Sequence, residues 1–103
     1  MSRIIARYTG GFVTENDNGY RVFVKFVKRE RHFMRKNRSW GISLAIVQEL
    51  NRLGTDSIEL HITDENEVLF VDMETFNAKS SIESYNGNDE QAFLFEGFWA
   101  VMG

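Results

Sequence analysis

Residues 40–63 read WGISLAIVQELNRLGTDSIELHIT, and a change of hydrophobic period within them indicates the fold class. Apolar residues recur at spacings of three and four as far as Leu53, and then at alternate positions in the segment SIELHIT. The first spacing is typical of one face of a helix, and the second is typical of one face of a strand. We therefore expect a helix over about 40–53, followed by a strand with one solvent-facing side.

Polar and glycine residues at the two ends support this helix. Ser39 is a suitable N-cap, with Ser43 as the less favoured alternative, because a serine oxygen accepts from the free N–H groups of a first turn. Gly54 stands where a left-handed residue commonly ends a helix.

The rest of the chain alternates β-prone segments with turns. The tetrapeptide Asn16-Asp17-Asn18-Gly19 is typical of a hairpin turn, and a second turn is expected at 86–89. The tail 91–102 is left open between strand and helix. The further β-prone segments are 4–9, 12–15, 20–28, 68–71 and 80–85. The sequence thus predicts a single α+β domain over 1–103, with a mostly antiparallel sheet of about five to six strands and one helix packed on a face.

The hydrophobic pattern also predicts a core between this helix and the sheet. In the segment 20–28 we expect Tyr20, Val22, Val24 and Phe26 to face the core. Across the helix and the later strands, the residues expected to be buried together are Ile46, Leu50, Ile58, Leu60, Ile62 and Phe70.

Composition and motifs exclude several classes of function. The chain has no Cys, which excludes disulfides, thiolate nucleophiles and Cys-ligated zinc. No apolar run approaches the roughly 20 residues of a membrane span, and Arg7 interrupts the only candidate signal-peptide core, so we expect a cytoplasmic protein. No Gly-x-Ser-x-Gly elbow or phosphate-binding glycine loop is present, and we expect no catalytic residue, cofactor or metal.

The charge of the chain is divided between its two halves. Residues 1–52 hold eleven Lys/Arg and four Asp/Glu, whereas residues 53–103 hold one Lys and eleven acids. The basic half peaks in the run 25–38, which has seven Lys/Arg. Such asymmetry is typical of proteins with a charged partner. The candidate binding residues in and beside this run are Lys28, Arg29, Arg31, His32, Phe33, Arg35, Lys36, Arg38 and Trp40.

Three partners for the basic run stay open. Lys and Arg neutralise phosphates, and aromatic side chains such as Phe33 and Trp40 stack on exposed bases, so the run suits DNA or RNA. An acidic protein is a second candidate. The acidic half of the chain itself is the third.

The acidic half offers a second candidate surface around one expected hairpin. Carboxylates on such a hairpin would imitate a row of phosphates and attract a nucleic-acid-binding groove. The alternative is that they serve solubility and edge protection. The residues concerned are Asp56, Glu59, Asp64, Glu65 and Glu67.

A nuclease-like metal cluster is the weakest of the charged candidates. His61 and Glu59 share a strand face, and Asp72 or Glu74 from the next segment would complete a set of ligands. No Glu-x-Lys follows the first acid, as a nuclease core of the Asp…Glu-x-Lys type requires. We expect His61 to be an ordinary surface residue.

These observations favour a small non-enzymatic interaction protein that binds or blocks a nucleic-acid-processing complex. The acidic, Cys-free, single-domain profile resembles that of phage- or plasmid-encoded inhibitors such as anti-CRISPR proteins, although no motif carries the resemblance and it assigns no residue a role. Direct DNA or RNA binding through 25–38 is the second hypothesis, since the sequence pI of 5.3 is low for a general nucleic-acid binder. A metal-dependent nuclease is the third. A homodimer is left open, because an exposed Phe98 or Trp99 in the aromatic tail would mark a protein interface.

Overall fold

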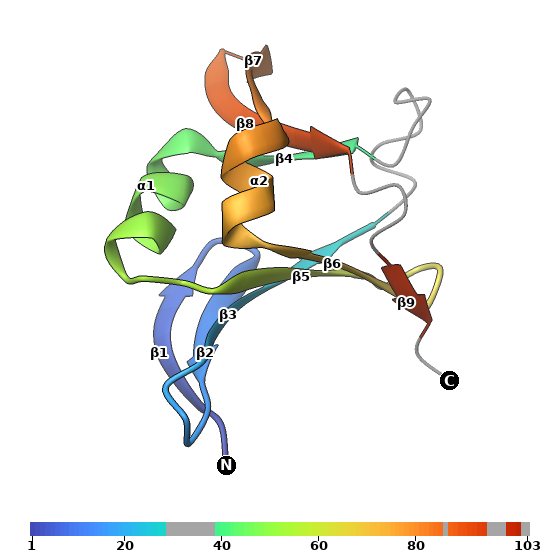
Figure 1. Ribbon diagram of the computed structural model, residues 1–103. Helices are drawn as coiled ribbons and strands as arrows, with labels where there is room; N and C mark the ends of the chain where they lie inside the picture. The colour runs from blue at the N-terminus through green and yellow to red at the C-terminus, as the bar shows by residue number, and fades with distance from the viewer. Residues whose placement is uncertain (29–38, 86, 95–98, 102–103) are drawn as a thin grey trace.

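The computed structural model describes residues 1–28, 39–85, 87–94 and 99–101, and two sheets organise this part of the chain (Figure 1). The large sheet has six strands in the order β1-β2-β3-β5-β6-β9, and the small sheet has three in the order β4-β8-β7. The strands of the large sheet are β1 (Arg3–Tyr8), β2 (Gly11–Glu15), β3 (Arg21–Val27), β5 (Ser57–Ile62), β6 (Glu67–Asp72) and β9 (Trp99–Val101). The remaining elements are β4 (Ser39–Ser43), β7 (Ser81–Tyr85), β8 (Asn88–Leu94) and the helices α1 (Leu44–Arg52) and α2 (Met73–Lys79).

Antiparallel pairing joins all neighbouring strands of the described residues except one pair. The exception is β3 with β5, which run parallel with Val22 opposite Ser57 and Val27 opposite Ile62. Parallel neighbours need a crossover, and here β4 and α1 occupy the sequence between them. The α+β class and the mostly antiparallel large sheet confirm the sequence prediction.

The prediction was wrong about where the helix begins. Residues 39–43 are extended and pair with β8, and α1 starts at Leu44 with Ser43 as its N-cap. In this strand Trp40 and Ile42 lie two residues apart on one face, and both are fully buried. A short apolar run fits strand and helix spacings equally well, so periodicity could not distinguish them. The end of the helix was predicted correctly, since Gly54 has φ +66° and donates its N–H to the Asn51 carbonyl.

A second helix, α2, was not predicted. Asp72 caps it, because its Oδ1 accepts from the Thr75 N–H at 2.7 Å, and this bond lowers the pKa of the Asp72 carboxyl. Met73 and Phe76 are its buried residues. Seven residues are too few to show a clear helical period in the sequence.

The predicted turn at 16–19 is confirmed. Asn16 Oδ1 accepts from the N–H groups of Asn18 and Tyr20, and Gly19 adopts φ +79°. The tail contains the strands β8 and β9, and the structure does not describe 95–98, 102 and 103.

The core lies between the large sheet on one side and the helices with the small sheet on the other. Leu50, Ile58, Leu60 and Ile62 are fully buried as predicted, and Ile46 packs against this core while partly buried. Phe70 was assigned to the core wrongly, because it is 43% exposed and its neighbours Leu69 and Val71 are buried instead.

The predicted core face of β3 was also wrong. Phe23 is fully buried, whereas Tyr20 and Phe26 are exposed, so the face of Val22, Val24 and Phe26 points away from the helices. β6 is apolar on both faces over Val68–Val71, and the covered face of β3 holds Arg21 and Lys25 beside Phe23, so alternation alone did not identify the covered face.

We predict that Leu50→Ala lowers the free energy of unfolding by about 2–5 kcal/mol, because it removes a fully buried side chain from α1. Urea denaturation checks this, with Gln48→Ala on the exposed side of α1 as the control. A loss below about 0.5 kcal/mol would show that α1 does not pack as described.

Candidate interaction face

The large sheet has one side without described elements packed on it. In Figure 1 both helices and the small sheet lie above the large sheet, and its lower side faces away from them. We call the residues at its centre the outer face: Phe12, Val24, Phe26, Glu59, His61, Val68 and Phe70.

Strand register brings these residues together from four strands. Val24 on β3 lies opposite Phe12 on β2 and opposite Glu59 on β5, and Glu59 in turn lies opposite Phe70 on β6. Residues directly opposite one another point to the same side of a sheet. Since adjacent strands are about 4.8 Å apart, this row spans roughly 14 Å.

A second row runs beside the first. Phe26 on β3 lies opposite His61 on β5, and His61 lies opposite Val68 on β6. Its aromatic rings are in contact, with centroids 5.2 Å apart for Phe26 and His61 and 5.9 Å apart for Phe26 and Phe12. The residues of the two rows are therefore in contact and form one continuous surface.

The polar groups of the outer face are paired with each other. With its proton on Nε2, His61 donates a hydrogen bond to Glu59 Oε2 at 3.2 Å. The two side chains are 21% and 37% exposed. This pairing uses one oxygen of Glu59, and a carboxylate can accept further hydrogen bonds, so a donor from a partner can bind the other oxygen.

Two phenylalanines project from the outer face into solvent. Phe26 is 45% exposed and Phe70 is 43% exposed, whereas Val24 and Val68 between them are nearly buried. Exposed aromatic side chains on one apolar patch, with polar residues such as Thr14 and Asp72 at its border, are typical of a binding surface.

The structure moves Trp40 out of the predicted basic site. Trp40 is 1% exposed and lies opposite Phe93 within the small sheet, so its assignment as a base-stacking residue was wrong. The predicted Lys28 is exposed just after β3. The other predicted binding residues lie outside the described residues: Arg29, Arg31, His32, Phe33, Arg35, Lys36 and Arg38.

The five predicted acidic residues do not form one surface. Asp56 precedes β5, and its Oδ2 accepts from the Arg21 N–H at 2.8 Å. Asp64, Glu65 and Glu67 lie at the far end of β5, which is about 20 Å away for a six-residue strand. Glu59 alone belongs to the outer face.

The suggested metal ligands are not brought together either. His61 and Glu59 are paired, but Asp72 lies opposite Ser57 and caps α2, with Glu74 in the first turn of that helix. Among the described residues, no group of three or more His, Cys, Asp or Glu side chains is placed to hold a metal ion. The described helices also include none long and apolar enough to cross a membrane.

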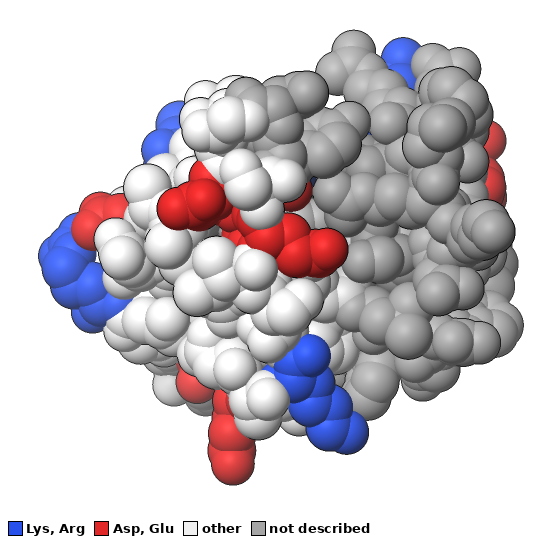
Figure 2. Space-filling model, turned by 90° about the horizontal axis from the view of Figure 1, so that it is seen from above, with Lys and Arg blue, Asp and Glu red and all other residues white. Residues whose placement is uncertain are grey.

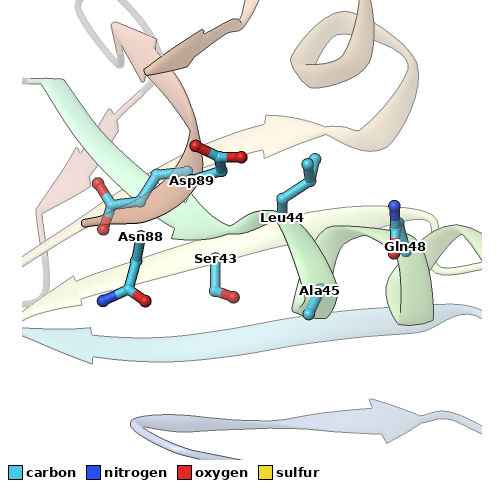
Figure 3. A pocket seen from close by; sticks show the side chains of 7 residues that line it. Ser43, Leu44, Ala45, Gln48, Asn88 and Asp89 are labelled. Carbon is cyan, nitrogen blue, oxygen red and sulfur yellow. The ribbon is translucent and has the colours of Figure 1, made fainter. Parts of the chain in front are cut away.

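An open pocket is the second candidate site. It lies between the start of α1 and the start of β8, and its described lining is Ser43, Leu44, Ala45, Gln48, Asn88, Asp89 and Glu90 (Figure 3). A serine, two amides and two carboxylates do not form a pair of nucleophile and base. We therefore treat the outer face as the stronger candidate site.

Lys25 lies near this pocket on the core side of β3. Burial lowers the pKa of its ammonium group, and the negative charge of Glu90 opposes that effect. The turn before β2 lies beside this lysine, since a Cβ on Gly10 would lie 3.5 Å from Lys25 Nζ.

The comparisons with known proteins add no relative. No family model, no curated protein and no solved structure matches this chain. The assignment of the outer face therefore rests on its geometry.

We predict a pH effect from Lys25. Because its pKa is lower in the folded chain than the 10.5 of a free lysine, the folded state binds fewer protons between these two values, and stability rises with pH there. Lys25→Met should abolish this rise and be at least as stable as the parent chain near neutral pH. Thermal unfolding at several pH values up to about 10 tests this, and parallel pH profiles for the two chains would contradict it.

Proposed function

We propose that this chain is a small non-enzymatic interaction protein that binds a protein partner through the outer face. The observation that carries this proposal is the pair Phe26 and Phe70, both more than 40% exposed on one continuous surface of four strands. Aromatic side chains at the centre of such a surface supply much of the binding energy of protein interfaces.

The charge of the outer face favours a protein over a nucleic acid. Its seven residues include Glu59 at the centre and contain no Lys or Arg, and the cation next to them in the register is Arg7 on the edge strand β1, opposite Phe12. A sheet that stacks bases also needs cations for the phosphates, whereas a central carboxylate repels them. An apolar protein surface with a donor opposite Glu59 complements the face better.

The wider sequence supports a partner that works on nucleic acid. The basic run 25–38 begins within β3, the strand that supplies Val24 and Phe26, and continues beyond the end of that strand. A protein of a nucleic-acid-processing complex would offer two contacts. Its apolar surface would cover the outer face, and nearby phosphates or acidic groups would meet the basic run. Blocking such a complex is the activity we propose.

Direct binding of DNA or RNA through 25–38 is the second candidate, and the seven Lys/Arg among its fourteen residues favour it. It requires affinity for free nucleic acid that falls steeply with salt. The proposed protein partner requires a complex that persists after nuclease treatment.

We predict that the double variant Phe26→Ser, Phe70→Ser keeps its fold but loses its partner. Both side chains are exposed in the free protein, so their loss should change the melting temperature by only a few degrees. Truncation of central aromatic residues should weaken binding at least roughly 30-fold. Capture from a lysate of the source cells, with and without nuclease, gives the readout.

Tyr20→Ser is the matched control, because Tyr20 is 42% exposed but lies before β3, at the opposite end from Phe26. It should capture the same partner as the parent chain. Retention of that partner by the double variant would refute the outer face as the binding site. A partner set that disappears on nuclease treatment would favour the second candidate.

A further inference from the structure

The small sheet ends in a strand with few of the usual protections against pairing. β7 pairs with β8 over five residues without a shift of register, and among the described residues no strand pairs with its other edge. Edge strands present a row of backbone N–H and C=O groups that another strand can pair with. Residues 81–84 are all exposed, and Ile82 is 65% exposed.

The other described edges differ from β7. β1, at one edge of the large sheet, carries Arg3 and Arg7 and has an irregular register between Ile4 and Ala6. β9 has only three residues. β4, at the other edge of the small sheet, contributes buried side chains to the core. Charges, bulges and short length discourage edge pairing, and β7 has no bulge, Lys or Pro, with Glu83 as its single charged residue.

Charge indicates what kind of strand would pair with β7. Glu83 lies directly opposite Glu90, and Ser84 lies opposite Asp89. Glu83 is exposed at the centre of β7, so a cation opposite it on an incoming strand is favourable and a carboxylate there is unfavourable. Figure 2, which looks down on this end of the molecule, shows acidic side chains gathered near the middle of the described surface.

A second copy of the chain fits this edge poorly. An antiparallel pair of β7 strands uses all five residues only when Glu83 faces Glu83 of the other copy, since Glu83 is the central residue of Ser81–Tyr85. That register places two carboxylates directly opposite each other. A strand with Lys or Arg at this position has no such conflict.

We propose that the free edge of β7 accepts an extended segment of another protein, as an added strand with Lys or Arg opposite Glu83. The backbone supplies the hydrogen bonds, Ile82 supplies an apolar contact, and Glu83 selects for positive charge. In Figure 1 β7 lies at the top of the molecule, on the other side of the large sheet from the outer face, so either surface can bind without the other.

The test uses the full chain labelled for NMR and two peptides of about nine residues in which Val and Thr alternate. The central residue is Lys in one peptide and Glu in the other. We expect the Lys peptide to shift and protect amides of Ser81–Tyr85. It should bind roughly five-fold more tightly than the Glu peptide, and Glu83→Lys should reverse that preference. The control Glu74→Lys changes an exposed acid on α2 and should keep the parent preference.

Three outcomes would overturn this proposal. One is the absence of any change at β7 with saturating peptide. Another is a shift confined to outer-face residues such as Phe26 and Phe70. The third is a concentration-dependent change at β7 without peptide, which would assign the edge to a second copy of the chain.

Discussion

The parallel pairing of β3 with β5 is the constraint on which the rest of the structure depends. Two parallel neighbours cannot be joined by a tight turn, so the chain must leave the large sheet and return to it. The segment between them forms β4 and α1, and β4 then provides the strand on which β8 and β7 assemble. In Figure 1 these elements and α2 all lie on the same side of the large sheet. The crossover thus decides which face becomes the core and which stays open.

The outer face follows from that one-sided arrangement. The described helices and the small sheet cover the side of the large sheet that holds Phe23, Leu60 and Leu69, all of which are fully buried. The opposite side holds the apolar residues Phe12, Val24, Phe26, Val68 and Phe70 around the pair Glu59 and His61. Phe26 and Phe70 are exposed on this side, and the partner that we propose would cover them.

The sequence allowed the fold class and several local features to be predicted, but it did not predict which face of each strand is buried. The Asn-Gly turn and Gly54 have residue types that specify a backbone conformation, and both were located correctly. The start of α1 was missed because Trp40 and Ile42 suit a strand as well as a helix. Phe70 was assigned to the wrong face because every residue from Val68 to Val71 is apolar, and only the tertiary packing of α1 and α2 breaks that symmetry. The same ambiguity concealed the candidate site, whose signal in the sequence is that β6 is apolar at both parities and that Val22, Val24 and Phe26 form an apolar face of β3.

The central claim is that the outer face is open in the free protein. Solvent paramagnetic relaxation enhancement of the phenylalanine rings by a soluble, uncharged relaxation agent measures this directly. The rings of Phe26 and Phe70 should be strongly attenuated in the free chain and protected in the complex, while the ring of Phe23 should be protected in both. Protection of Phe26 and Phe70 in the dilute free protein, equal to that of Phe23, would contradict the account.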